Sequence, residues 1–138
     1  MRKRSRAREF ALQILYQMEM TSESPDHSLD NFWGSRPEED IDTEIKEFCA
    51  RIIRGVAEHL AEIDKKISQY ATNWQLERMA VVDKNVLRMS AFELMFCADI
   101  PPKVSINEAV DLAKKYSGPE AGKFVNAILD KVKLEKEK

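Results

Sequence analysis

The chain has 138 residues and a formal net charge of -2, and 43% of its residues are hydrophobic while 33% are charged. This length suits a single domain that buries a core without disulfides or metal, and this composition is typical of a soluble globular protein rather than a disordered one. Four glycines and five prolines are few, which favours long regular elements over a turn-rich sandwich. The basic amino terminus is not followed by an apolar run, so we expect no secretory signal and no membrane span.

Charge is distributed unevenly along the sequence. Acidic residues dominate residues 38–47, whereas basic residues crowd the amino terminus. The basic residues are Arg2, Lys3, Arg4, Arg6 and Arg8. A negative total argues mildly against a nucleic-acid partner, but separated charges create local potentials that the total conceals. The basic cluster is therefore either a solvated, frayed terminus or a phosphate-binding surface, since arginine binds phosphate through a planar fork of donors.

The first half of the chain shows helical periodicity and no strand pattern. A helix is predicted over residues 4–20, with Arg4 and Arg8 on one face and Arg6 about 200° away from Arg4 around the axis. Residues 21–40 read as a loop around one short helix at 29–33, in which Phe32 and Trp33 anchor the segment to the core. A long helical region, capped by Asp42, is predicted over residues 42–70, with Gly55 as the place for a bend.

The second half of the chain is predicted to be helical as well. We expect the two halves to meet near residue 72, giving segments 1–72 and 73–138, with Trp74 filling the junction. Asp83 is a candidate cap for a helix that is apolar on nearly every side and hence buried, so its Arg88 and Glu93 need partners. Ser105 and Glu108 match a capping box at the start of the next helix. Ser117, Gly118 and Pro119 predict the end of that helix and the start of the last one, giving an antiparallel hairpin.

The sequence offers no set of residues for catalysis or metal binding. Cys49 and Cys97 lie in apolar helical patterns without close spacing, which favours buried, reduced thiols in a cytoplasmic protein. His27 and His59 are isolated from other ligand-type residues, so no metal site is predicted. No nucleophile motif, glycine-rich phosphate loop or paired Cys/His set is present. We therefore predict a protein that is not an enzyme and that uses no cofactor.

Three segments, in the same order and at the same separations, resemble the NusB family of transcription antitermination factors. They are RSRAREFALQILY (4–16), LERMAVVDKNVLRMSAFEL (76–94) and INEAVDLAK (106–114) followed by KFVNAILD (123–130). The resemblance covers nearly the whole chain and is weakest over residues 19–42. It implies one all-α domain of six or seven helices, arranged as two packed helical bundles.

The resemblance also implies a function and its partners. A NusB protein binds the boxA RNA of ribosomal RNA leader transcripts together with the ribosomal protein NusE. This assembly joins the elongating RNA polymerase through other Nus factors and suppresses premature termination. Single-stranded RNA of this kind exposes bases for stacking on aromatic side chains, while its phosphates attract positive charge.

The resemblance further assigns roles to individual positions. The implied RNA-binding residues are Arg2, Lys3, Arg4, Arg6, Arg8, Lys123, Phe124 and Asn126. The residues implied for the NusE partner are Tyr16, Asp83 and Glu120. Of these, the acidic Glu120 is implied to moderate the affinity for RNA and for the partner. Core packing is the competing explanation for Phe124, and helix capping is the competing explanation for Asp83. Ala127 departs from the family pattern, which commonly has glycine there.

Two other functions remain open at this point. The chain could be a protein-only helical adaptor whose basic terminus merely keeps it soluble. NusB-like domains also precede ribosomal RNA methyltransferases, although this chain has no cofactor-binding glycine loop. A homodimer is a further option, because an apolar surface reserved for NusE could bury itself against a second copy. The RNA interpretation requires the arginines of the first helix and the Lys123 segment to share one exposed surface.

Overall fold

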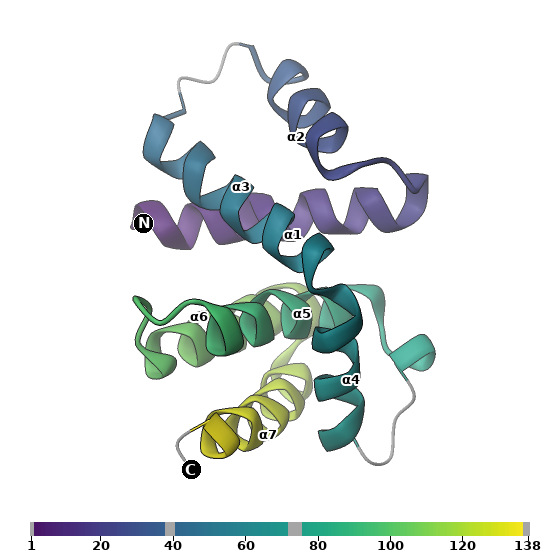
Figure 1. The fold of residues 1–138 in the computed structure, drawn as a ribbon, viewed down its shortest axis with the longest axis vertical. Helices are drawn as coiled ribbons and strands as arrows, with labels where there is room; N and C mark the ends of the chain where they lie inside the picture. Colours follow the sequence, from purple (N-terminus) through teal and green to yellow (C-terminus); the bar gives the residue numbers. More distant parts are fainter. Residues whose placement is uncertain (1, 38–40, 72–75, 137–138) are drawn as a thin grey trace. The chain divides into compact units, whose positions relative to one another are not determined.

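The computed structural model of the chain describes residues 2–37, 41–71 and 76–136. Within these residues the chain forms seven α-helices and one 3-10 helix, with no strand (Figure 1). The α-helices are α1 (Lys3–Thr21), α2 (Pro25–Gly34), α3 (Thr43–Glu58), α4 (Leu60–Tyr70), α5 (Val81–Phe96), α6 (Pro102–Ser117) and α7 (Pro119–Lys136), and the 3-10 helix is Leu76–Arg78. The predicted all-α fold is confirmed. No described helix combines the length and apolarity needed to cross a membrane.

The helices fall into two compact units, Met1–Glu58 with α1 to α3 and His59–Lys138 with α4 to α7. This division comes earlier than the boundary near residue 72 that the sequence suggests. The region predicted to be helical over residues 42–70 is helical, but its break lies at His59, while Gly55, the predicted place for a bend, stays inside α3. The physical reason is tertiary: α3 packs on α1 and α2, whereas α4 packs on α5 and α7. Trp74 lies outside the described residues.

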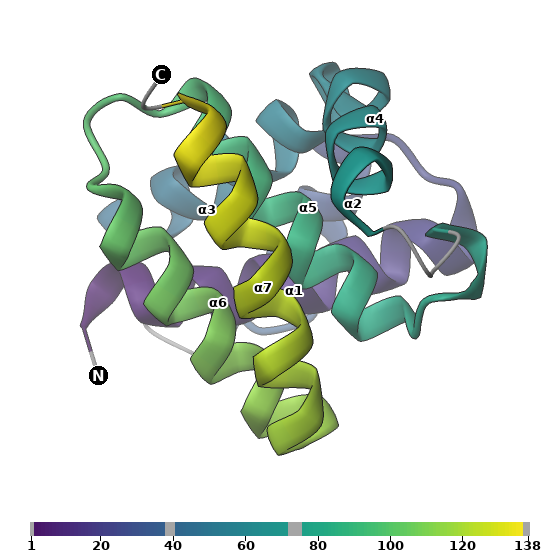
Figure 2. The same ribbon diagram turned by 90° about the horizontal axis from the view of Figure 1, so that it is seen from below.

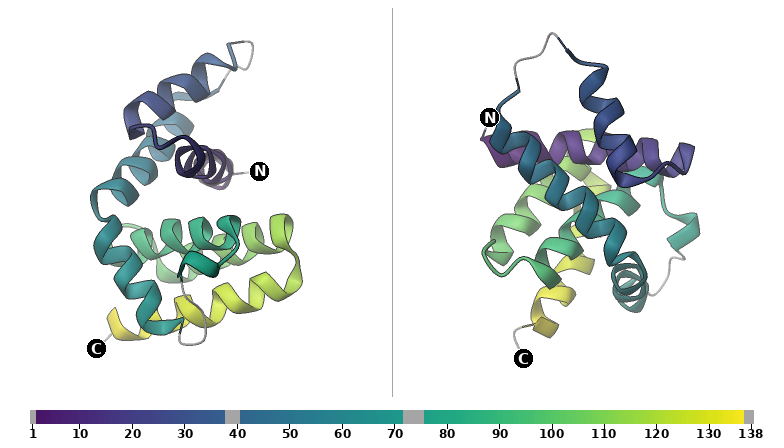
Figure 3. Two further views of the ribbon diagram at one scale, coloured as in Figure 1. Left: turned by 90° about the vertical axis from the view of Figure 1, so that its right-hand side faces the viewer. Right: turned by 45° about the horizontal axis from the view of Figure 1, so that its top comes forward.

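In the first unit, α3 crosses α1, and α2 packs against both (Figures 1 and 3). Phe10 of α1 meets Phe32 and Trp33 of α2 in edge-to-face contacts with ring centroids 5.6 and 5.5 Å away. The predicted anchoring role of Phe32 and Trp33 is therefore confirmed. The α2 helix is longer than predicted, because the Ser24 hydroxyl accepts a hydrogen bond from the His27 amide at 3.2 Å and caps a helix that begins at Pro25.

In the second unit, α6 and α7 run side by side as an antiparallel hairpin (Figures 2 and 3). Gly118 ends α6 with a φ of 101°, a conformation that favours glycine, and Pro119 opens α7 as predicted. Gly122 lets the hairpin close tightly, since a Cβ atom there would lie 2.7 Å from Cγ of Lys114 on α6. The hairpin is therefore set by two glycines and one proline at defined positions.

The start of α6 differs from the sequence prediction. Pro101 occupies the N-cap position without a side-chain cap, so the predicted capping box of Ser105 and Glu108 is wrong. Ser105 lies inside the helix, is buried, and donates its hydroxyl to the Glu93 carboxylate of α5 at 2.8 Å. A buried carboxylate needs donors more than an exposed helix start needs a cap, so the tertiary partner prevails over the local one.

The other charged residue of α5 also finds a partner on a neighbouring helix. Arg88 donates to both carboxylate oxygens of Asp64 on α4, at 2.8 and 2.9 Å. This two-bond geometry is the strong form of an arginine–carboxylate pair. The prediction that Arg88 needs a partner is confirmed, and its ion pair with Asp64 joins α4 to α5.

The cysteines are free and buried, as predicted, and burial raises the pKa of the Cys49 thiol to about 12. His59 stacks on Phe96 with ring centroids 3.9 Å apart, which makes it a packing residue. His27 lies 3.8 Å from a carboxylate oxygen of Glu23 on the surface. Among the described residues, no group of three or more His, Cys, Asp or Glu side chains is arranged to hold a metal ion.

The substitution Ser105→Ala should lower the free energy of unfolding by about 1–3 kcal/mol, because the buried Glu93 loses a hydroxyl donor. Urea unfolding followed by circular dichroism measures the change. Thr21→Ala is the control, since the Thr21 hydroxyl makes its hydrogen bond at an exposed helix end. Equal losses in the two variants would contradict a special role for the hydrogen bond from Ser105.

Candidate nucleic-acid interface

The basic residues of α1 are organised by two aromatic rings. The guanidinium carbons of Arg4 and Arg8 lie 4.5 and 5.1 Å from the ring centroid of Phe48 on α3. Arg6 points elsewhere, with its guanidinium 5.2 Å from the ring of Phe10. The predicted arrangement, with Arg4 and Arg8 on one face and Arg6 on another, is confirmed. Helix α1 is formed from Lys3 onward, so these residues belong to an ordered helix rather than to a frayed tail.

The members of this cluster differ in their access to solvent. Arg2, Lys3 and Arg4 are exposed and Arg6 is half-buried, whereas Arg8 is only 2% exposed. Cation–π contacts of this kind strengthen when the cation is removed from water. The geometry therefore separates Arg8, packed against Phe48, from the four basic residues that have solvent-accessible surface.

Lys3 contacts the acidic segment from which it is far removed in sequence. Its Nζ lies 3.0 Å from Oδ2 of Asp42 and 3.4 Å from Oε2 of Glu44. Hydrogen bonds to these two carboxylates raise the pKa of Lys3 above its usual value, and the bond from Lys3 lowers the pKa of Asp42. Asp42 also caps α3, as predicted, by accepting from the Glu44 amide at 2.8 Å. The two charged segments thus partly neutralise each other in space.

A hollow of about 350 Å³ opens in the first unit between α1 and α3. Its lining combines cations, carboxylates and one aromatic residue. The lining residues are Lys3, Arg4, Glu44, Glu47, Phe48 and Arg51. Sequence reasoning missed Phe48 and Arg51 as site residues, because helical periodicity assigns Phe48 only to an apolar stripe and carries no signal for Arg51.

The predicted site residues of the second unit lie on α7. The Nζ of Lys123 is 3.5 Å from Oε1 of Glu120, and both side chains are exposed. Phe124 is half-buried, so it is neither fully in the core nor fully on the surface, while Asn126 and Ala127 are exposed. The structure therefore brings the predicted cation and the predicted moderating carboxylate into direct contact.

Two of the residues implied for a protein partner, Tyr16 and Asp83, differ in exposure and in hydrogen bonding. Tyr16, near the end of α1, has 47% of its surface exposed. Asp83 is the third residue of α5, where Ala80 occupies the N-cap position without a side-chain bond, so the predicted capping role of Asp83 is wrong. Its Oδ1 atom is buried and has no hydrogen-bond partner in the described part of the chain. Asp83 therefore retains acceptor capacity that the helix start does not use.

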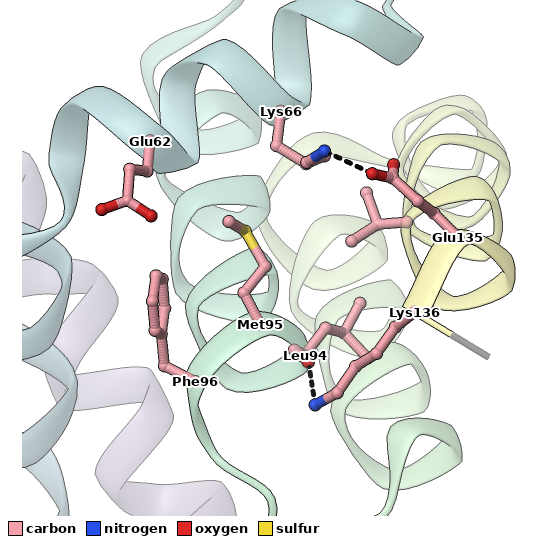
Figure 4. Close-up of a pocket in the computed structure, with 8 residues that line it drawn as sticks. Glu62, Lys66, Leu94, Met95, Phe96, Glu135 and Lys136 are labelled. Atoms are coloured by element: carbon pink, nitrogen blue, oxygen red, sulfur yellow. Dashed lines mark hydrogen bonds and ion pairs between the residues drawn. The ribbon is translucent and has the colours of Figure 1, made fainter. Parts of the chain in front are cut away.

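A second hollow, of about 320 Å³, lies within the second unit between α4, α5 and α7 (Figure 4). Its apolar lining includes Leu94 and Phe96, and its charged rim is already paired. Lys66 contacts Glu135 at 2.6 Å, and Lys136 donates to the Leu94 carbonyl at 2.5 Å (Figure 4). None of the residues predicted for RNA or partner binding lines this hollow.

Known proteins resemble this chain along almost its whole length. A transcription antitermination protein NusB from Anaeromyxobacter dehalogenans is 48% identical over 130 residues, which cover 94% of this chain and 89% of that protein. The corresponding protein of Thermodesulfovibrio yellowstonii is 43% identical over 141 residues, covering 96% and 93%.

Solved structures of NusB proteins are also similar to this chain. A T. maritima NusB structure is 41% identical, with a TM-score of 0.85, and the similarity covers 96% of this chain and 91% of that one. A NusB chain solved with NusE and double-stranded RNA is 28% identical, with a TM-score of 0.86 and 98% coverage of both chains. The model of the NusB family matches residues 5–133. Sequence, helical order and overall similarity therefore agree that this chain belongs to the NusB family.

Proposed function

We propose that the chain is a transcription antitermination factor that binds boxA RNA of ribosomal RNA leader transcripts together with NusE. In this role it joins the elongating RNA polymerase through other Nus factors, in the cytoplasm where transcripts are made. The family match over residues 5–133 carries the proposal, and the relative at 48% identity bears the name of this function. A NusB structure with NusE and RNA supports the choice of partners. The role is one of binding, without catalysis and without a cofactor.

RNA-binding residues are proposed in each of the two units. The exposed basic residues at the start of α1 supply positive charge for phosphates. On α7, Lys123 adds a cation, the half-buried Phe124 adds an aromatic side chain for stacking, and Asn126 adds an amide. Arg8 contributes indirectly in this proposal, because it is packed against Phe48 and helps hold α1 on α3.

The affinity of the chain alone for RNA should be modest. The formal net charge is -2, and both Lys3 and Lys123 are partly neutralised by carboxylates. Counterion release drives the binding of basic surfaces to RNA, so the affinity depends on how many cations reach phosphates. A ribosomal protein that adds positive surface should therefore raise the affinity of the complex.

The central test is an RNA shift assay with a boxA oligonucleotide, single-stranded and annealed to its complement, with and without NusE. The variant Arg4→Ala/Arg6→Ala should bind boxA roughly tenfold more weakly, and the salt slope of log K should become shallower by about 0.7 for each phosphate that the variant no longer neutralises. Lys123→Ala should act in the same direction by a smaller factor.

The control for this test is Lys65→Ala/Lys103→Ala, which removes two exposed cations from α4 and α6. A scrambled RNA controls for sequence. If the wild-type chain shifts neither RNA at low salt and the arginine variant changes nothing, the chain is a protein-only adaptor. Copurification with a separate methyltransferase subunit would instead indicate the methyltransferase-associated role.

Replacing Glu120 by glutamine should raise the affinity for boxA RNA roughly two- to fivefold, because exposed pairs are weak and Lys123 is then released for phosphate. The gain should vanish in Glu120→Gln/Lys123→Ala, as a filter-binding titration would show. Asp130→Asn on the same helix removes an equal charge from an exposed position and is the control. A gain that persists without Lys123 would contradict the proposed competition.

The partner surface is tested by Tyr16→Ala and Asp83→Asn, measured by calorimetric titration with NusE. Each should weaken binding by roughly five- to fiftyfold, since tyrosine is enriched among the residues that dominate interface energies and the Asp83 carboxylate has an acceptor atom that no described residue engages. The matched controls are Tyr116→Ala, an exposed tyrosine of α6, and Asp111→Asn, an exposed carboxylate of the same helix. Losses of the same size in the controls would count against this surface.

A further inference from the structure

The Lys3 cluster, defined as Lys3 with Asp42 and Glu44, joins the basic start of α1 to the acidic start of α3. Lys3 Nζ bridges the two carboxylates at 3.0 and 3.4 Å. Asp42 and Glu44 also suit the first turn of α3, because carboxylates there complement the positive end of the helix dipole. The same two groups thus serve the helix and hold a cation that lies 41 residues from Glu44 in sequence.

The cluster stands at the rim of the hollow between α1 and α3. Lys3 and Glu44 both line that hollow, together with Arg4 above the Phe48 ring. The exposed cations Lys3 and Arg4 offer positive charge for an RNA phosphate, whereas the buried Phe48 ring holds Arg4 in place. The carboxylates oppose this use, because they repel phosphate and occupy the ammonium group of Lys3.

The interactions of Lys3 are of a kind that RNA can replace. The side chains of Lys3, Asp42 and Glu44 are 53%, 41% and 73% exposed. Exposed ion pairs contribute little to stability, because water and salt screen them and the side chains lose freedom. When a phosphate binds Lys3, the weak ion pairs of Lys3 with the two carboxylates are replaced by an ion pair with the phosphate, and counterions are released from the RNA.

We propose that Asp42 and Glu44 set the RNA affinity of the first unit by competing with RNA phosphate for Lys3. In the free chain, Asp42 and Glu44 bind the ammonium group of Lys3. In the complex, an RNA phosphate at the hollow between α1 and α3 replaces these two carboxylates as the partner of Lys3. This inference rests on the proposed RNA-binding function and adds two acidic residues to the site that it uses.

The test is a double-mutant cycle in the boxA shift assay. Asp42→Asn/Glu44→Gln removes both charges and keeps the helix cap, because asparagine caps as well as aspartate. This variant should bind boxA roughly three- to tenfold more tightly, because phosphate no longer competes with two carboxylates for Lys3. Lys3→Ala should weaken the binding of boxA by the wild-type chain, because the phosphate loses its ammonium partner, and it should abolish the gain in the Asp42→Asn/Glu44→Gln background.

The charge-matched control is Asp26→Asn/Asp30→Asn, which removes two exposed carboxylates of α2 in the same unit, one of them paired with Arg54 at 2.9 Å. A gain equal to that of the control, or one that survives Lys3→Ala, overturns the competition. If the wild-type chain binds no RNA, the proposed function itself fails, and the two failures are thereby distinguished. Asp42→Asn alone, with the same Lys3→Ala cycle, decides the question if the double variant loses helix content by circular dichroism.

Discussion

The order of the basic end of this protein depends on the ring of Phe48. This side chain lies on the buried face of α3, and the guanidinium groups of Arg4 and Arg8 both lie close to its ring. A ring face attracts a cation and also accepts its planar surface, so it can hold an arginine where water is scarce. The start of α1 is consequently a fixed helix that presents its remaining cations in a defined direction, at a low entropic cost on binding RNA.

The charge balance of the first unit follows from the same packing. Crossing α1 over α3 brings the basic terminus to the acidic start of α3, so that Lys3 contacts Asp42 and Glu44. A comparable pair, Lys123 with Glu120, occurs on α7 in the second unit. Both predicted RNA-binding regions thus contain a cation next to a carboxylate. Such balance limits nonspecific attraction to any polyanion and leaves affinity to be completed by a partner or a specific RNA.

The second unit is held in register by polar groups of its most buried helix. Glu93 of α5 accepts from Ser105 of α6, while Arg88 of α5 binds Asp64 of α4 through two hydrogen bonds. Apolar packing alone tolerates sliding of one helix along another, whereas a buried carboxylate requires its donor at one position. These hydrogen bonds fix neighbouring helices against α5, and the tight turn at Gly118 then positions Lys123 and Phe124 at the start of α7.

The sequence by itself determined the local features of this protein: helical periodicity, the Asp42 cap, the turn at Gly118 and Pro119, and the opposite faces of Arg4 and Arg6. These depend on interactions within a few residues, and the motifs shared with the NusB family extended them to the fold. Only the tertiary structure decided that the chain breaks at His59, that Ser105 serves Glu93 instead of a capping box, and that Arg8 is buried against Phe48. Each of these outcomes depends on a group from a distant helix, and the energy of burying a polar or charged side chain exceeds the local preference that the sequence displays.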